Sequence, residues 1–403
     1  MKLILFIKSL KFYNLNLNHE IVVIGPNGSD LLKKFFLKNF FYISIFNSIP
    51  INFILIPNAI KYFFKILFTN PIFFFKRYKI IFFLSFTLSF IEKKKIKKLI
   101  CFDLYNILPN YLEIFYNKKI KIIKIQNGVG IEHKFQNKNH FHFVFSKKDI
   151  IHKKNTYLMA NLKLLLYLYL NEQNKNYLLS EKNEIKNITI VSSANYDSIK
   201  FLHEKIKNKK KILLDTLPKL KTKGLDIEKD WLKLRAINFV MLCLYINEFL
   251  KVSKIKCNIL LRSKSKSDLK IEKEFFRKII YNCKFIKNHE RYKYNYIINS
   301  KKTLFVSDNS TFGFEIFSLN KKSLFFSWCF HDRKNFHQMP KNSLLYFKSR
   351  SINKFKARIK KLFVLSNKGF INEKKKKFKD NSMIFPKLDQ LDFFLKISGL
   401  EIK

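Results

Sequence analysis

The segment Ser307 to Glu315 carries residue types that could bind a diphosphate. It follows the apolar run Thr303–Val306, which predicts a buried strand, and it opens a second apolar stretch that predicts a helix. The hydroxyls of Ser310 and Thr311 should therefore lie at a helix N-terminus, where unpaired amides and partial positive charge attract anions. Gly313 would allow the backbone to approach such a ligand closely.

Glu315 closes this segment and has two interpretations. We expect it on the first turn of the helix, where its carboxylate can pair with the amides of that turn in a capping box. The same carboxylate could instead accept hydrogen bonds from the hydroxyls of a ribose. The sequence leaves both interpretations open, and they predict different effects of removing the charge.

Arg262 is a further candidate for holding phosphate. It immediately follows the predicted strand Cys257–Leu261, with Lys264 two residues further on. A guanidinium at the carboxyl end of a strand is suited to a forked contact with phosphate. A plain surface charge is the alternative, because Lys and Arg are abundant throughout this chain.

Polar residues also follow two predicted strands in the first half of the chain, and these residues are Asp103, Gln126, Asn127 and Gly128. The strands are Lys98–Phe102 and Ile120–Ile125. At the carboxyl ends of parallel strands, side chains face the ligand crevice of an open α/β sheet. Gly128 lets the backbone turn sharply and leaves the two amide side chains free to bond to hydroxyls. An ordinary strand-to-helix turn is the alternative.

Glu132 and His133 follow this turn, and either could act as a general base near neutral pH. His140 and His142, two residues apart in an extended segment, would point to one face as metal ligands sometimes do, but no third ligand accompanies them. Solvated side chains are the better interpretation of that pair. The sequence has no C-x-x-C and no Asp-x-Asp, so we predict no metal site.

Short apolar runs alternate with helix-like amphipathic segments along the whole chain, which predicts strand–helix units and parallel sheets. The expected strands are Ile21–Ile24, Asn52–Ile56, Lys98–Phe102, Ile120–Ile125, Phe141–Phe145, Ile188–Val191, Ile212–Leu214, Cys257–Leu261, Thr303–Val306 and Ser323–Phe326. Trp231 to Val252 predicts a crossover helix on the second sheet. The fold class is therefore α/β, with two Rossmann-like doubly wound domains facing a central cleft.

A polar stretch rich in Asn, Lys and Glu, from Asn171 to Asn187, predicts a linker between the two sets of strands. We therefore expect an N-terminal domain at 1–175 and a C-terminal domain at 188–375. Residues 376–403 form a tail, in which Leu388 to Leu395 has the spacing of an amphipathic helix.

The composition is that of a globular protein with a strong basic excess. The chain has 403 residues, of which 47% are hydrophobic and 16% aromatic, which disfavours an intrinsically disordered chain. The formal net charge of +50 favours contact with phosphate arrays, either nucleic acid or an anionic membrane. A bias toward A/T-rich codons would produce the same Lys, Asn, Ile and Phe excess without any functional cause.

Neither of the long apolar stretches predicts an integral membrane protein. Asn39 to Ile60 is uncharged, but prolines and asparagines interrupt it, and Phe73 to Ile91 is cut by Lys76, Arg77 and Lys79. No small-residue cleavage site follows the first ten residues, and the odd number of Cys predicts no disulfide framework. We expect a cytoplasmic protein, peripheral on the inner membrane face through its lysines.

Several of these motifs together resemble a known family. They are the Ser-Thr-x-Gly-x-Glu helix entry at Ser310, the following Lys321 to Ser327, Ile125 to Gly128, Phe143 to Phe145, Arg262 and Asn299-Ser300. Taken in their order along the chain, these motifs look like those of bacterial surface carbohydrate (polysaccharide) biosynthesis proteins. Such proteins are similar to glycosyltransferases of the GT-B fold, and more distantly to CDP-glycerol transferases and UDP-N-acetylglucosamine 2-epimerases.

The resemblance implies a glycosyltransferase that takes a nucleotide-sugar as its donor substrate and holds no permanent cofactor. Ser310, Thr311 and Gly313 would lie at the diphosphate, Glu315 at the ribose, and Arg262 would assist. The glycan or lipid-linked acceptor would enter from the first domain. With no Asp-x-Asp in the sequence, helix amides and basic side chains would stabilise the leaving nucleoside diphosphate without a metal.

Two other functions remain possible at this stage. A nucleotide-sugar 2-epimerase on the same fold would be expected to carry paired glycines near Ser310, and these are absent. A basic nucleic-acid-binding protein would need clustered Arg and exposed aromatic residues, whereas the aromatic residues here fall within apolar runs. We therefore expect no nucleic-acid partner.

Overall fold

The structure is a computed structural model. It describes residues 10–12, 20–24, 29–37, 40–43, 49–69, 71–102, 120–126, 156–160, 162, 165–166, 169, 185–192, 227–262, 265–286, 296–297, 299–300, 302–308, 310–328, 343–377 and 389–403. The chain divides into two compact units. The described residues of unit 1 lie within Met1–Gly128, Ser146–Leu170 and Pro386–Lys403, and those of unit 2 lie within Asn171–Phe385.

Unit 2 is built on a parallel sheet of six strands. In spatial order these are β10 (Cys283–Ile286), β9 (Lys256–Leu260), β8 (Asn187–Val191), β11 (Thr303–Asp308), β12 (Ser323–Phe326) and β13 (Tyr346–Phe347). All neighbouring strands pair in parallel. The chain starts at β8, adds β9 and β10 on one side, and then adds β11, β12 and β13 on the other side. This is the strand order of the doubly wound Rossmann fold.

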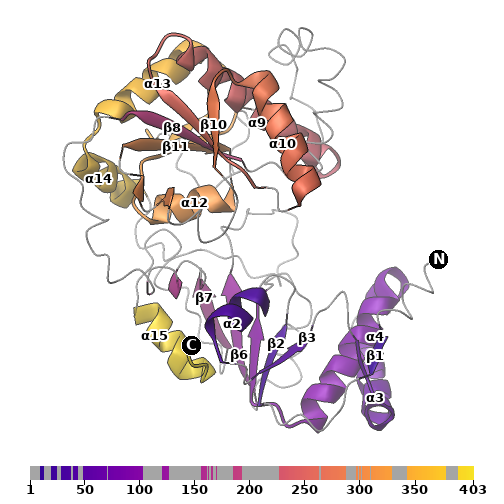
Figure 1. Cartoon of the computed structure of the whole chain (residues 1–403). Coiled ribbons are helices and arrows are strands. Elements are labelled where there is room, and N and C mark those ends of the chain that lie inside the picture. Colours follow the sequence, from indigo (N-terminus) through magenta and orange to yellow (C-terminus); the bar gives the residue numbers. More distant parts are fainter. Residues whose placement is uncertain are drawn as a thin grey trace. The chain divides into compact units, whose positions relative to one another are not determined.

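Helices cover both faces of this sheet, which explains why its strands are apolar along their whole length. They are α9 (Ile227–Leu250), α10 (Lys266–Ile279), α12 (Thr311–Ser318), α13 (Ile352–Val364) and α14 (Asn367–Lys377). Figure 1 shows α12 on the opposite side of the sheet from α13. The predicted crossover helix is α9, and every side chain from Ala236 to Cys243 is buried in the core.

Unit 1 has a five-stranded parallel sheet with a different strand order. Its strands, in spatial order, are β3 (Phe41–Ile43), β2 (Ile21–Ile24), β5 (Lys98–Cys101), β6 (Lys121–Gln126) and β7 (Thr156–Ala160). This is the other common doubly wound strand order. The chain adds β3 on one side of β2 and then adds β5, β6 and β7 on the other side. The two parallel sheets confirm the predicted α/β class with two Rossmann-like units. A small parallel pair, β1 (Leu10–Phe12) and β4 (Ile49–Ile51), also belongs to unit 1.

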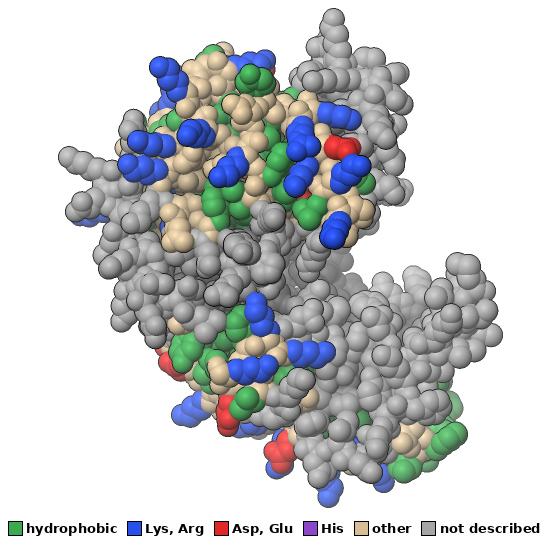
Figure 2. Space-filling view, viewed as in Figure 1, with side chains coloured by type: hydrophobic (Ala, Val, Ile, Leu, Met, Phe, Trp, Pro, Cys, Tyr) green, Lys and Arg blue, Asp and Glu red, His purple; other side chains and the backbone are tan. Residues whose placement is uncertain are grey.

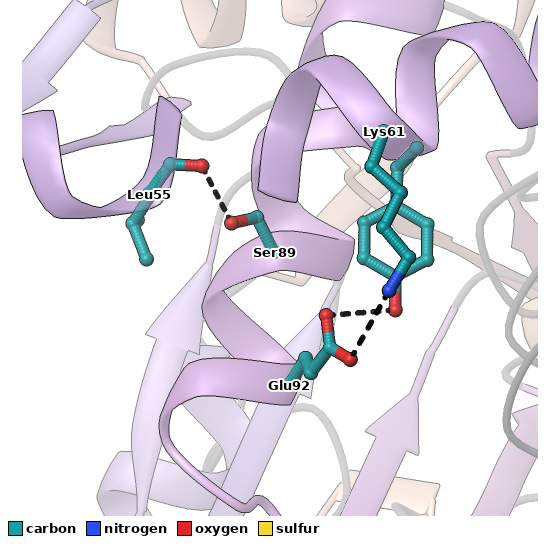
Figure 3. A network of polar contacts seen from close by, with 5 residues as sticks. Leu55, Lys61, Ser89 and Glu92 are labelled. Carbon is teal, nitrogen blue, oxygen red and sulfur yellow. Dashed lines mark hydrogen bonds and ion pairs between the residues drawn. The ribbon is translucent and has the colours of Figure 1, made fainter. Parts of the chain in front are cut away.

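Two antiparallel helices, α3 (Ile56–Thr69) and α4 (Pro71–Lys93), pack against this sheet. Polar contacts fix how they lie against each other, as Figure 3 shows. Tyr62 donates a hydrogen bond to Glu92 at 3.0 Å, and the Ser89 hydroxyl donates to the Leu55 carbonyl at 2.7 Å. Among the described residues, no helix combines the length and the low charge needed to span a membrane.

The predicted strand Asn52–Ile56 is wrong. The Asn52 side chain accepts a hydrogen bond from the Ile54 amide and starts a 3₁₀ helix, Phe53–Leu55, that leads directly into α3. Leu55, Ala59 and Ile66 then bury one helical face, so the apolar run follows helical spacing after all. The strand of this region is β4, which ends one residue before Asn52.

Most other predicted strands are confirmed to within about two residues, the usual uncertainty of element boundaries. Ile21–Ile24 and Ser323–Phe326 match their observed bounds. Phe141–Phe145 and Ile212–Leu214 lie outside the described residues.

The helix predicted in the tail is α15 (Asp389–Ser398), and it packs on unit 1 together with α2 (Ser29–Phe35). Phe36 and Ile402 form an antiparallel bridge, and the rings of Phe36 and Phe394 meet edge to face with centroids 6.1 Å apart. Unit 1 is therefore assembled from segments near both ends of the printed sequence.

Candidate functional site

The strand order of the unit 2 sheet has its switch point between the central strands β8 and β11, because the chain adds strands on one side of β8 and later on the other. From β8 the chain continues outward through β9 and β10, and from β11 it continues outward on the other side through β12 and β13. Ligands of open α/β sheets bind outside the carboxyl ends of the strands at such a point. The residues that end β8 and β11, and the helix after β11, are therefore the first place to look for a site.

Ser192 and Asp308 lie at these two strand ends. Both are buried, and the Ser192 backbone amide donates to the Leu260 carbonyl at 3.2 Å. The Ser192 hydroxyl has no hydrogen-bond partner among the described residues although its side chain is 0% exposed. Burying an unpaired hydroxyl costs about 1–3 kcal/mol, so this hydroxyl is a candidate for a contact with a bound group or with water.

The N-terminus of α12 lies at the same edge, directly after β11. Ser310 is the N-cap residue, with extended backbone angles, and its side chain makes no capping hydrogen bond to the helix. Thr311 is the first helical residue, and its side chain lies outside the described set. The Ser310 hydroxyl therefore does not satisfy the first amides of α12, and this helix N-terminus directly follows β11 at the switch point of the sheet.

Glu315 is in the second turn of α12, which corrects the expectation that it lies in the first. The helix begins at Thr311, and its first turn contains no acidic residue. A capping box needs its carboxylate at the third helical position, which Gly313 occupies. The capping interpretation of Glu315 is therefore wrong, and the residue is instead a buried carboxylate, 7% exposed.

Gly313 allows a close approach, but the approach in this structure is between α12 and β11. A Cβ atom added at Gly313 would lie 2.3 Å from the Ser307 Oγ and 3.0 Å from the Ser307 Cβ, both on β11. It would also contact the Phe325 ring at 3.4 Å. The missing side chain thus lets the helix lie close to the strand, and it fixes where the helix N-terminus sits.

Arg262 is brought to the N-terminus of α12, although β8 separates its strand from β11. Its guanidinium carbon lies 5.1 Å from the centroid of the Phe312 ring, in the first turn of α12. Glu272 of α10 holds the loop that carries Arg262, since both of its carboxylate oxygens accept from the Arg262 amide, at 3.0 and 3.2 Å. The two phosphate-binding candidates from distant parts of the sequence therefore share one place in unit 2.

We expect Glu272→Ala to lower the free energy of unfolding by about 1–3 kcal/mol, because it leaves the Arg262 amide without its buried acceptor. Urea denaturation measures this change. Lys270→Ala, an exposed position on the same helix, is the matched control and should change stability by less than about 0.5 kcal/mol. Equal effects of the two substitutions would mean that the contact does not hold the loop.

The other end of α12 is fixed by Lys374 of α14. Its ammonium donates to the Phe317 carbonyl at 2.7 Å, to the Ser318 carbonyl at 3.3 Å and to the Asn320 side chain at 2.8 Å. Burial lowers the pKa of Lys374 well below its ordinary value. These hydrogen bonds satisfy the last carbonyls of α12, so the helix is anchored at its C-terminus while its N-terminus follows directly on β11.

The predicted residues of the first half are largely beyond what the structure describes. Gln126 is the last residue of β6, so its backbone lies at the carboxyl edge of the unit 1 sheet, but its side chain is not described. The remaining candidates of this half lie outside the described residues: Asp103, Asn127, Gly128, Glu132 and His133. Within the described part of the chain, no group of His, Cys, Asp and Glu side chains could hold a metal ion.

Two residues of the unit 2 site were not among the predicted ones, and these are Ser192 and Glu272. Asp308 lies within the predicted segment Ser307 to Glu315 but was given no role of its own. The rule that selected Arg262, a polar residue directly after a predicted strand, also applies to Ser192 and could have found it. Glu272 is seven residues into a helix and carried no such signal, because its role depends on a contact back to the preceding loop.

No protein-family model matches this sequence, and no curated protein matches it. Among solved structures, UDP-GlcNAc 2-epimerase from Methanocaldococcus jannaschii, in complex with UDP-GlcNAc and UDP, is similar over 94% of this chain and 99% of its own, with 12% identity and a TM-score of 0.44. The 2-epimerase from Neisseria meningitidis, bound to UDP-GlcNAc, is similar over 94% and 98%, with 10% identity and a TM-score of 0.41.

A mutant of TarM from S. aureus, in complex with Fondaparinux, alpha-GlcNAc-glycerol and UDP, is similar over 79% of this chain and 59% of its own. Its identity is 12% and its TM-score 0.37. All three similarities are too distant to transfer a function, which has to come from the topology and side chains of this chain.

Proposed function

We propose that this protein is a glycosyltransferase of the GT-B type that moves a sugar from a nucleotide-activated donor to a surface glycan acceptor. The observation that carries the proposal is the meeting of Arg262 with the N-terminus of α12 at the switch point of the unit 2 sheet. A helix N-terminus and a guanidinium together form a site for a diphosphate. The resemblance of the sequence to surface-carbohydrate enzymes supports the same substrate class.

Unit 2 would hold the donor. The first amides of α12, with the Ser310 and Thr311 hydroxyls, bind the diphosphate in this proposal, and Arg262 makes the forked contact. Gly313 serves by holding the helix against β11, and Glu315 accepts the ribose hydroxyls. Ser192 is buried at the next strand end without a hydrogen-bond partner among the described residues, and in this proposal it donates to the same ligand.

The reaction would break the bond between the anomeric carbon and the diphosphate oxygen, which leaves with the electron pair. An acceptor hydroxyl forms the new bond to that carbon and gives its proton to a base, for which Glu132 and His133 are the candidates. Negative charge develops on the leaving diphosphate, where the helix amides and Arg262 stabilise it. We propose that no metal is required, because the sequence lacks an Asp-x-Asp motif.

Unit 1 would hold the acceptor, a glycan or a lipid-linked sugar. In this proposal Asp103, Gln126, Asn127 and Gly128 bind its hydroxyls at the carboxyl edge of the sheet. The acceptor class and the charge of +50 suit an enzyme on the cytoplasmic face of a membrane, attached peripherally.

A thermal-shift screen against UDP-, CMP-, CDP- and GDP-sugars tests the proposal. A ligand at about 100 times its Kd should stabilise the protein by about 2.7 kcal/mol and raise its melting temperature. Release of the nucleotide should then require an acceptor, whereas conversion of free UDP-GlcNAc without acceptor would indicate a 2-epimerase. If no nucleotide-sugar stabilises the protein and an oligonucleotide does, the nucleic-acid alternative is correct and the proposal is wrong.

A further inference from the structure

The outward face of the short 3₁₀ helix and of α3 exposes a row of large apolar side chains. Its members are Phe53, Ile54, Ile60, Phe64 and Phe68. Phe53 is 78% exposed and Phe68 is 81% exposed, and the last three residues are spaced by four, which places them on one side of the helix. Figure 2 shows hydrophobic side chains uncovered at the place where Figure 1 shows α3. We call this surface the α3 row.

The opposite face of α3 is committed to the core, so the helix cannot turn the α3 row inward. Leu55, Ala59, Tyr62 and Ile66 are buried against α4 and the unit 1 sheet. The bond from Tyr62 to Glu92 and the bond from Ser89 to Leu55 set the rotation of the helix (Figure 3). Apolar residues on both faces of one helix need a partner on each face.

The charges beside the α3 row are all positive along α3 itself. The helix contains no Asp or Glu, and the exposed Lys61 and Lys65 border the row, each with its ammonium within 6 Å of the Tyr62 ring at 5.7 and 5.9 Å. Glu92 of α4 pairs with Lys61 at 3.8 Å.

We propose that the α3 row is a membrane-docking surface that inserts its phenylalanines at the headgroup boundary of an anionic bilayer. A helix with an apolar face bordered by lysines lies in the plane of the interface, and its lysines reach the lipid phosphates. The inference names the surface responsible for the peripheral attachment proposed above. It does not depend on which nucleotide-sugar unit 2 binds.

A second copy of this chain fits the α3 row less well. In a two-fold interface the same patch meets itself, so Lys61 and Lys65 would approach their own counterparts with no acid of α3 to compensate. Anionic lipid supplies the missing negative charge. Charge complementarity therefore favours a lipid surface.

Co-sedimentation with vesicles of phosphatidylcholine and phosphatidylglycerol in equal amounts tests the proposal. The double variant Phe64→Ser/Phe68→Ser should lower the partition coefficient by about tenfold or more, since two rings no longer leave water. The matched control is Tyr281→Ser/Val364→Ser, which removes side chains 82% and 86% exposed on unit 2 and should leave binding unchanged. Equal losses in the two variants, or no loss in the first, would overturn the assignment.

Depth-dependent quenching separates insertion from surface adhesion. With brominated lipids, the added fluorescence of Phe68→Trp should be quenched, and that of Val364→Trp should not. Light scattering of the protein without vesicles tests the alternative that the α3 row binds a second copy. A dimer that becomes a monomer in Phe64→Ser/Phe68→Ser would support that alternative and contradict the proposal. The nucleotide affinity of the same variant should stay unchanged. Vesicle binding therefore tests the α3 row, and nucleotide binding tests the proposed function, independently of each other.

Discussion

Glu315→Gln should weaken nucleotide-sugar binding by about tenfold to a hundredfold, with a melting temperature close to that of the unaltered protein. The amide keeps the shape and one acceptor but removes the charge, which is worth about 1.5–3 kcal/mol in a desolvated contact to hydroxyls. The position of Glu315 in the second turn of α12 removes the alternative that it caps the helix, so no capping energy is lost. Calorimetric titration with the nucleotide-sugar found in the screen measures the change.

Two further variants make this test specific. Ser310→Ala should give a smaller loss in the same direction, because it removes one neutral hydroxyl from the diphosphate site. Glu373→Gln removes a partly buried carboxylate of α14, which accepts from the Leu344 amide, and should leave nucleotide affinity unchanged. Unchanged affinity in Glu315→Gln together with a lowered melting temperature would show that the carboxylate serves the fold and not a ribose.

Gly313→Val should lower the free energy of unfolding by about 1–3 kcal/mol. The new Cβ would fall 2.3 Å from the Ser307 Oγ and 3.0 Å from the Ser307 Cβ, so α12 has to move away from β11. Since α12 carries the proposed diphosphate amides, nucleotide affinity should fall as well. Urea denaturation gives the first quantity, and titration of the folded variant gives the second.

The exchange Ser307→Gly/Gly313→Ala is the control for this clash. It moves the small side chain from the strand to the helix and should recover most of the stability that Gly313→Ala alone loses. If the single and double variants are equally unstable, the contact with Ser307 is not what requires glycine at this position.

The sequence predicted strands well where they are buried in the middle of a sheet. β2 and β12 are short apolar runs with polar residues at both ends, and both are covered on their two faces, so burial leaves a continuous signal. β10 lies at a sheet edge, where Lys284 is exposed and its neighbours are only half-buried, and it was missed. β13 has two residues, too few for any periodicity.

The candidate site was predictable only where position along a strand determines it. Arg262 and the segment from Ser307 to Glu315 were found because they follow strands, and the structure brings Arg262 to Phe312 of that segment. The contact of Glu272 with the Arg262 amide and the fit of Gly313 against Ser307 depend on distances across the fold. No local pattern of residues specifies such distances.

The return of the chain to unit 1 has a consequence for folding during synthesis. The Leu37 amide donates to the Glu401 carbonyl at 3.0 Å, and the Lys403 amide donates to the Phe35 carbonyl at 3.0 Å, so α2 is completed by residues made much later. Domains generally fold as units while the ribosome works. Here the described residues of unit 2, which lie within Asn171–Phe385, are all made before the last segment of unit 1, Pro386–Lys403. Unit 1 is thus begun first and completed last. Until the C-terminal segment with α15 has been made, the surface of α2 that it covers remains exposed.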